Sequence, residues 1–479
     1  MAQPNQSSNN FHIAMFPWFA MGHITPFLHL SNELAARGHR ISFLVPKKAQ
    51  LELQHLNLHP NLISFHTITV PHVEGLPEGT EIASDIPTSM LLSIAMDLTR
   101  DQIQGFLKSS VVDHKNKIHL VFYDLAYWVP KITRPLGIKS ICYSIISAAA
   151  NALSLAPSNS LMINITEEKE EEEEEQLQLW KPPAGYPSST IVLLRGYEVR
   201  SISVIWKKPL GLNAITLYQR WTAAVKECDT FCIRTCREVE GDFCDYLEAQ
   251  HEKPVLLTGP VLGMEDSNTR REQLEERWAK WFSGFEPRSV VFCAFGSQCA
   301  LEKDQFQELV LGFELTGLPF FVALKPPVGC ATIEEALPHG FEVRVKGRGV
   351  VFGGWVQQPM ILSHMSVGCF VSHCGFGSMW ESLLSDNQIV LVPHLTDQIL
   401  NTKILVKELK IAVEVEREEN GWFSKESLSK AITTVMDKDN EVGVMVKKNH
   451  AKWRETLSTP GFMDGYIDSF VQKLRELVN

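Results

Sequence analysis

The stretch GCFVSHCGFGSMWES at residues 368–382 says most about the fold of this chain. Its apolar beginning, residues 368–372, predicts a short buried strand, and the residues around Ser378 predict a helix that carries Glu381. Two glycines, Gly375 and Gly377, lie between the strand and the helix. This order is typical of a parallel sheet covered by helices, in which ligands bind beyond the carboxyl ends of the strands.

The same alternation of apolar runs and amphipathic stretches continues on both sides of this segment. In the second half we expect further strands at 289–295, 319–324, 349–352 and 389–393, with a helix at 302–316 and helices near Met360 and Gln398. In the first half we expect strands at 11–18, 39–46, 62–70, 118–124 and 139–145, helices at 25–37 and 89–109, and one near Tyr127. The predicted fold class is α/β, with two doubly wound domains.

The domain boundaries follow from breaks in this pattern. We expect a first domain at 1–250, a linker at 251–263 that contains two prolines and two glycines, and a second domain at 264–457. A final helix within 458–479 is expected to pack back on the first domain. Residues 158–187 have no periodicity and carry a run of glutamates, so we expect a flexible acidic loop there.

Composition excludes several classes of protein. With 479 residues and 44% hydrophobic residues, the chain is neither a minimal binding module nor disordered throughout. Residues 167–175 hold eight Glu and one Lys, a net −7 of the chain's −11, so the other 470 residues carry only −4. No secretory signal and no run of eighteen apolar residues is present, so we expect a cytoplasmic protein without a membrane span or a nucleic-acid partner. The ten cysteines lack the spacing of zinc ribbons and fit buried thiols.

Two residues in the first half are candidates for acid–base chemistry. His23 follows the first expected strand, and Asp124 ends another, so a carboxylate could hold one imidazole nitrogen while the other acts as a base. The alternatives are a structural histidine and a helix-capping aspartate. We expect Thr25 and Pro26 to cap and open the helix that follows His23. No Gly-x-Ser-x-Gly sequence accompanies the pair, which leaves the triad of a hydrolase unsupported.

The second half offers groups suited to a nucleotide. The glycines and the helix start at 372–378 suit a diphosphate, His373 can donate to one of its oxygens, and Glu381 can accept from ribose hydroxyls. Asp397 and Gln398 suit a polyhydroxyl ligand, although Asp397 also suits a helix cap. Glycines also serve tight packing, and Trp355 suits either a nucleobase or the core. Neither a Walker A sequence nor Gly-x-Gly-x-x-Gly is present.

Residues 355–398, with the landmarks WVQQP, LSH, HCGFGSMWES and PHLTDQ, resemble the signature box of plant family 1 UDP-glycosyltransferases. The pairs at 22–23, 123–124 and 296–297 and the TGP at 258–260 stand in family order. FPWFAMGHI, which ends at Ile24, and the HCGFG variant resemble the branch that attaches sugars to sugars already present on flavonoids, triterpenes or other plant glycosides.

The resemblance implies a GT-B fold, two Rossmann-like domains facing a cleft, and transfer from a UDP-sugar, most often UDP-glucose, with inversion. His23 would be the base and Asp124 its partner. The residues implied in donor binding are Ser144, Ser297, Trp355, Val356, Gln358, His373, Gly375, Gly377, Ser378, Glu381, Asp397 and Gln398. The expected acceptor pocket includes Trp18, Phe19, Tyr143 and Ile145. No metal site, no further cofactor and a monomer are expected.

The chain departs from the common family box at two positions, where Phe376 and Gly377 stand in place of Trp and Asn. Gly377 lacks an amide side chain that commonly contacts the donor. Alternatives to the favoured function are transfer to an aglycone hydroxyl and the use of UDP-xylose or UDP-rhamnose. A non-catalytic binder of nucleotide sugars or glycosides and a glycoside hydrolase are the alternatives from other classes.

Overall fold

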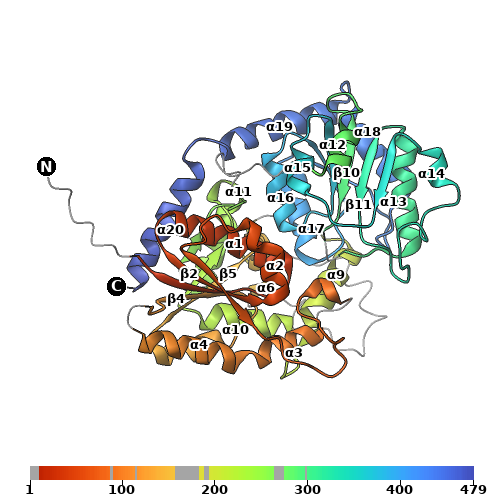
Figure 1. Ribbon diagram of the computed structural model, residues 1–479. Helices are drawn as coiled ribbons and strands as arrows, with labels where there is room; N and C mark the ends of the chain where they lie inside the picture. Colours follow the sequence, from red (N-terminus) through yellow and green to blue (C-terminus); the bar gives the residue numbers. More distant parts are fainter. Residues whose placement is uncertain are drawn as a thin grey trace. The chain divides into compact units, whose positions relative to one another are not determined.

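The computed structural model describes residues 10–86, 90–113, 116–156, 183–187, 194–263, 274–296 and 299–478 (Figure 1). The chain divides into two compact units. The first unit is Met1–Pro157, Trp206–Met264 and Gly461–Asn479, and the second is Ser158–Ile205 and Glu265–Pro460. Among the described residues, no helix has the length and apolarity that crossing a membrane requires.

The first unit is built on a seven-stranded sheet in the order β3-β2-β1-β4-β5-β8-β9, and every pairing is parallel. Its inner strands are short and largely buried on both faces, as a parallel sheet covered by helices requires, whereas the edge strands β3 and β9 are only partly buried. They are β1 (His12–Phe16), β2 (Arg40–Pro46), β3 (Ile63–Ile68), β4 (Leu120–Tyr123), β5 (Lys139–Ser144), β8 (Thr230–Ile233) and β9 (Val255–Leu257).

Helices cover both faces of this sheet, with α1 and α20 on one face and α4 and α10 on the other (Figure 1). The longer helices are α1 (Met21–Ala36), α3 (Met90–Leu98), α4 (Arg100–Val112), α6 (Ala148–Leu155), α10 (Leu217–Glu227), α11 (Arg237–His251) and α20 (Phe462–Val478). The short helices are α2 (Lys47–Leu53) and α5 (Val129–Thr133), and β6 (Pro209–Leu210) pairs antiparallel with β7 (Ile215–Thr216). Because Ile467, Phe470 and Leu474 of α20 are buried in the core of this unit, the end of the chain belongs to it.

The second unit has a six-stranded parallel sheet in the order β12-β11-β10-β13-β14-β15. Its strands are β10 (Val290–Ala294), β11 (Phe320–Ala323), β12 (Gly349–Phe352), β13 (Val367–Ser372), β14 (Gln388–Leu391) and β15 (Val413–Glu414). Its helices include α12 (Glu276–Phe282), α13 (Lys303–Thr316), α14 (Phe341–Arg344), α15 (Gln358–Leu362), α16 (Phe376–Leu384), α17 (Thr396–Lys403), α18 (Lys425–Met436) and α19 (Glu441–Leu457). The helix α9 (Gly196–Lys207) runs from the second unit into the first along the chain.

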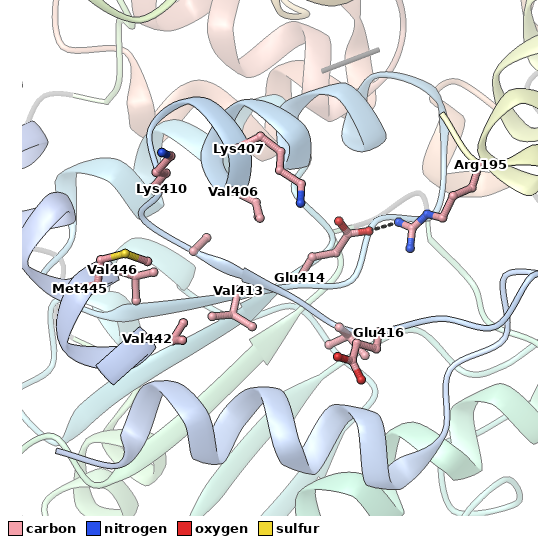
Figure 2. A pocket seen from close by; sticks show the side chains of 12 residues that line it. Arg195, Val406, Lys407, Lys410, Val413, Glu414, Glu416, Val442, Met445 and Val446 are labelled. Carbon is pink, nitrogen blue, oxygen red and sulfur yellow. Dashed lines mark hydrogen bonds and ion pairs between the residues drawn. The ribbon is translucent and has the colours of Figure 1, made fainter. Parts of the chain in front are cut away.

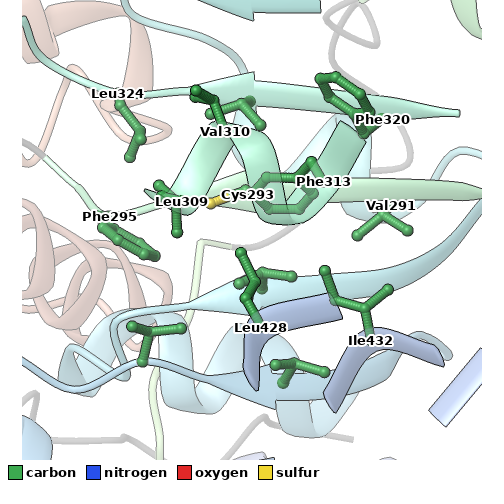
Figure 3. Packing of buried hydrophobic residues seen from close by; sticks show 14 of the residues in the cluster. Val291, Cys293, Phe295, Leu309, Val310, Phe313, Phe320, Leu324, Leu428 and Ile432 are labelled. Atoms are coloured by element: carbon green, nitrogen blue, oxygen red, sulfur yellow. The ribbon is translucent and has the colours of Figure 1, made fainter. Parts of the chain in front are cut away.

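Side chains of β10 alternate between two cores, because successive residues of a strand point to opposite faces. Val291 and Cys293 pack with α13 and α18, as Figure 3 shows for Phe313, Leu428 and neighbouring residues. Val290 and Phe292 lie in the opposite core with residues of α12 and α15. The alternating residues of this one strand thus contribute to a core on each face of the sheet.

The α/β fold class and most expected strands are confirmed, but three local predictions were wrong. The first helix begins at Met21 rather than at residue 25, because the carbonyl of Ala20 accepts from the N–H groups of His23 and Ile24 and starts the helix ahead of Pro26. The helix expected at 89–109 is interrupted at Thr99, whose hydroxyl donates to the carbonyl of Met96. Residues 251–263 contain β9, an edge strand of the first sheet, where we expected only a linker.

Candidate functional site

The His23–Asp124 pair lies at the carboxyl ends of β1 and β4, which are neighbours in the first sheet. Nδ1 of His23 lies 2.7 Å from a carboxylate oxygen of Asp124. Asp124 is buried and also accepts from the backbone N–H groups of Trp18 at 2.8 Å and Leu125 at 2.6 Å. Since the carboxylate only accepts, the proton of this bond sits on Nδ1, and Nε2 of the imidazole is free to take a proton.

The side chain of His23 is 26% exposed, so a ligand can reach the ring. Asp124 anchors the loop after β1 as well as the imidazole. It does not cap the helix that follows, because α5 begins at Val129 and its N-cap is Trp128. The arrangement suits a general base whose tautomer is set by its neighbour.

The other expected residues of the first unit are mostly buried. Phe19 and Tyr143 are fully buried, with the Tyr143 ring packed edge-on against Phe27 at 5.0 Å. Trp18 is 6% exposed and stacks on Phe19, and Ile145 is half-buried. The buried hydroxyl of Ser144 accepts from the amide of Asn151 at 2.8 Å. The structure therefore gives Tyr143 and Phe19 a place in the core of this unit.

In the second unit, the two residues expected at the ribose, Gln358 and Glu381, lie together with Ser378, which was expected at the diphosphate. Gln358 opens α15, and its amide nitrogen donates to Glu381 at 2.5 Å and to Ser378 at 3.1 Å. Ser378 and Glu381 lie about one turn apart on α16, so they share a face. Trp355 is 78% exposed, an unusual position for this side chain, and it leaves a flat aromatic surface available for stacking, while Val356 is half-buried.

The expected diphosphate contacts gather where β13 meets α16. His373 is buried, and burial lowers its pKa to about 4, so at neutral pH the ring is uncharged. Gly375 is the N-cap of α16, and a Cβ placed on it would lie 2.6 Å from Nε2 of His373, which explains the glycine. Gly377 lies in the first turn of the same helix, where backbone N–H groups lack helical partners. Ser297 lies outside the described residues.

Asp397 and Gln398 open α17. The carbonyl oxygen of the Gln398 side chain accepts from the backbone N–H groups of His394 and Leu395, both at 3.0 Å, so its amide nitrogen is the group directed elsewhere. Asp397 accepts from the hydroxyl of Thr396 and from the amide of Asn401. Sequence reasoning missed Asn401; its spacing of four residues from Asp397 on one helix was the signal that could have found it.

Phe376, which stands where the common family box has Trp, is buried. The ring is 4% exposed and packs edge-on against Trp380 at 5.9 Å, so it belongs to the packing of α16 against its surroundings. Among the described residues, no group of three or more His, Cys, Asp or Glu side chains could hold a metal ion.

A pocket of about 390 Å³ lies elsewhere on the second unit (Figure 2). It is lined by β15, by α19 and by residues 406–410, which precede β15. Valine and methionine side chains line it, and the ion pair of Arg195 with Glu414 closes one side. A second pocket of about 340 Å³ in the first unit lies at the amino ends of the strands, near His12 and Arg40. Neither pocket includes a residue expected at the site.

The chain is similar to known proteins over nearly its whole length. A family model described as UDP-glucoronosyl and UDP-glucosyl transferase matches residues 345–450. UDP-glycosyltransferase 79B9 of Arabidopsis thaliana is 54% identical over 475 residues, which cover 98% of each chain. An anthocyanidin 3-O-glucoside 2'''-O-xylosyltransferase of Arabidopsis thaliana is 54% identical over 477 residues, covering 99% of this chain and 98% of the relative.

Solved structures show the same fold. Arabidopsis thaliana UGT89C1 in complex with UDP-L-rhamnose matches with a TM-score of 0.75 at 21% identity, over 98% of this chain and 100% of the other. A UDP-glucose: anthocyanidin 3-O-glucosyltransferase in complex with UDP also matches with a TM-score of 0.75, at 20% identity, over 98% of this chain and 99% of the other.

Proposed function

The chain belongs to the family of UDP-glycosyltransferases, and from this premise we propose that it transfers glucose or a related sugar from a UDP-sugar to a sugar hydroxyl of a plant glycoside. It is thus a transferase enzyme. A relative of 54% identity is named for xylosyl transfer to an anthocyanidin glucoside, which supports a glycoside as acceptor.

The observation that carries the proposed mechanism is the 2.7 Å hydrogen bond between His23 and Asp124. It leaves Nε2 of a part-exposed imidazole as a proton acceptor, while the buried carboxylate stabilises the imidazolium that forms. A sugar hydroxyl is a poor nucleophile until its proton is removed, so a base of this kind is what the transfer needs.

In the proposed step, Nε2 of His23 takes the proton of the acceptor hydroxyl as its oxygen attacks the anomeric carbon of the donor. The bond from that carbon to the phosphate oxygen breaks, and its electron pair leaves with UDP. Because attack and departure take place on opposite sides of the carbon, an α-linked donor yields a β-glycoside. The proton on His23 is released afterwards.

The donor is proposed to bind the second unit. Trp355 would stack on uracil, with Val356 beside it, and Gln358 and Glu381 would bind the ribose. The neutral His373, the backbone of Gly375 and Gly377, Ser378 and Ser297 would hold the diphosphate by hydrogen bonds and by the helix start. Asp397 and Gln398 would bind the transferred sugar, and Ser144, which belongs to the first unit, would be an additional donor contact.

The acceptor is proposed to bind beside His23. Trp18 and Ile145 retain some exposed surface, whereas Phe19 and Tyr143 would shape the site from within the core. UDP-glucose is the donor we favour. UDP-xylose and UDP-rhamnose are the runners-up, and transfer to an aglycone hydroxyl is the alternative for the acceptor.

A panel of UDP-release assays tests the proposal. Three donors, UDP-glucose, UDP-xylose and UDP-rhamnose, are crossed with flavonoids and their monoglucosides, and the linkage of each product is determined. We expect release of UDP with the monoglucosides and a new sugar–sugar linkage. Preference for the free flavonoids would overturn the choice of acceptor, and absence of UDP release with all pairs would favour a non-catalytic binder.

The variant His23→Ala tests the base. We expect kcat to fall by about 10³-fold while the affinity for UDP is unchanged, since the base contributes to the chemical step only. Normal turnover in this variant would contradict the role. Cleavage of glycosides without UDP would instead indicate a hydrolase.

Four further properties belong to the proposal. We expect activity to persist in EDTA because the helix start and His373 can stabilise the departing diphosphate. Light scattering is expected to give the mass of one 54.0 kDa chain. A fluorescent fusion is expected in the cytoplasm. No nucleic acid is expected as a partner.

A further inference from the structure

We propose that Asn401 is a positioning residue that ties the turn at Cys374 to the carboxylate of Asp397, so that a single side chain sets the spacing between the diphosphate contacts and the sugar contacts. The inference rests on the proposed function, since the donor roles of His373, Gly375 and Asp397 belong to it.

The geometry is that of a bridge. Asn401 is fully buried on α17, one turn after Asp397. Its amide nitrogen donates to the carbonyl oxygen of Cys374 at 2.9 Å and to a carboxylate oxygen of Asp397 at 3.3 Å. The bridge therefore joins the loop between β13 and α16 to the start of α17 through both protons of one nitrogen.

The chemistry of the two partners requires an amide at this place. A carbonyl and a carboxylate only accept, so the bridging atom has to carry two protons, as the nitrogen of an asparagine does. The reverse orientation would set the amide oxygen against two acceptors. Among the described residues, that oxygen is buried without a hydrogen-bond partner, so nothing opposes the orientation with the nitrogen at the bridge.

The first end of the bridge holds an uncommon backbone conformation. Cys374 has a φ of 62°, in the left-handed region that residues other than glycine rarely occupy, and its side chain is fully buried. Its N–H donates to the hydroxyl of Ser372 at 3.1 Å. His373 and Gly375 flank this residue, so the conformation of Cys374 sets the direction in which both face the proposed diphosphate.

The second end of the bridge orients a carboxylate. One oxygen of Asp397 accepts from the hydroxyl of Thr396 at 3.0 Å, and the other accepts from Asn401. With both oxygens held, the plane of the carboxylate is set, and its remaining lone pairs can accept from sugar hydroxyls. Loss of the Asn401 side chain would remove one hydrogen bond from the carbonyl of Cys374 and one from the carboxylate of Asp397.

Calorimetric titration of the full-length chain with UDP and, separately, with UDP-glucose tests the bridge without turnover. We expect Asn401→Ala to lower the affinity for UDP by about 10-fold, because the carbonyl of Cys374 loses its hydrogen bond from Asn401. The affinity for UDP-glucose is expected to fall further, because the carboxylate of Asp397 also loses its hydrogen bond from Asn401.

A second substitution separates the two ends. Glycine adopts positive φ without strain, so adding Cys374→Gly to Asn401→Ala is expected to restore UDP affinity to within about 3-fold of the wild type. The additional loss for UDP-glucose is expected to remain, since Asp397 stays unsupported. A variant that only destabilised the fold would not show this selective rescue.

Asn387→Ala is the matched control. Asn387 is also buried in the second unit, and its amide donates to the carbonyl of Leu362 at 2.8 Å. This variant is expected to lower the melting temperature and to leave the affinity for UDP unchanged.

Two results would overturn the inference: wild-type affinities for both ligands in Asn401→Ala, or no rescue by Cys374→Gly. If Asn401→Ala does not fold, Asn401→Asp keeps the volume but cannot donate, and unchanged affinities in that variant would also overturn it. A wild-type chain that binds neither UDP nor UDP-glucose would contradict the proposed function itself.

Discussion

Asp124 joins a structural contact to a proposed chemical role in one side chain. It accepts from two backbone N–H groups and from His23, so its carboxylate is held by three donors. An asparagine in its place would keep most of the volume and lose the charge that stabilises a protonated imidazole. The substitution of Asp124 by asparagine should therefore affect catalysis more than donor binding.

We expect Asp124→Asn to lower kcat by about 10²- to 10⁴-fold while the KM for the UDP-sugar changes little. Steady-state kinetics with saturating acceptor measures both values. A rate close to that of the wild type would show that the transfer does not need the charge of Asp124.

At the scale of elements, a buried ion pair joins several segments of the first unit. Arg220 of α10 forms a two-bond contact with Asp97 of α3, at 2.9 and 2.7 Å, and both side chains are nearly inaccessible. The same guanidinium donates to the carbonyl of Leu125, the residue after Asp124. The indole N–H of Trp128 also donates to Asp97. The loop that carries the catalytic candidate is thus anchored by two helices.

Arg220→Ala is expected to lower the free energy of unfolding by about 3–5 kcal/mol, because it leaves the Asp97 carboxylate buried without its charged partner. Urea denaturation measures the change. Arg237→Ala is the control in the same unit, since the pair of Arg237 with Asp245 is about half exposed and should contribute less than about 1 kcal/mol. Equal effects of the two substitutions would contradict the argument.

At the scale of the whole molecule, buried histidines make stability depend on pH. Burial lowers the pKa of His39 to about 4, that of His12 to about 4 and that of His29 to about 3. Protonation of His39 would also cost the bond in which its Nδ1 accepts from the N–H of Phe11 at 3.0 Å. Between pH 6.5 and 4 the unfolded chain binds more protons than the folded chain, so the free energy of unfolding falls as the pH is lowered.

The variant His39→Gln tests this linkage. Urea denaturation at pH 7.5, 6.0 and 5.0 is expected to show full stability at pH 7.5 and a loss toward pH 5.0. In the variant the slope should be shallower by up to one proton, or about 1.4 kcal/mol per pH unit. An identical slope in both proteins would contradict the assignment to His39, whatever the absolute stability of the variant.

The net charge of −11 has little consequence for the proposed binding of the donor. The run at 167–175 accounts for most of the −11, and it lies outside the described residues. The contacts proposed for the donor are local amides, a neutral histidine and a helix start, so the overall charge says little about binding of a diphosphate.

Much of the fold could be predicted because burial leaves a local pattern. The strand expected at 349–352 agrees with β12 at both ends, and Val291 and Cys293 alternate with residues of the opposite face as a two-sided strand must. The start of α1 could not be predicted in this way, because it depends on which carbonyl accepts the first helical bonds.

By itself, the sequence determined the class of the protein, through apolar runs of strand length and through the residues that follow them at 355–398. Only the tertiary structure decided which residues from distant parts of the chain are in contact. His23 meets Asp124 across 101 residues, Asn401 meets Cys374 across 27, and β9 joins a sheet from a segment that looks like a linker. Periodicity records whether a side chain is buried, but not its partner, since contacts between distant segments are set by the packing of the whole unit.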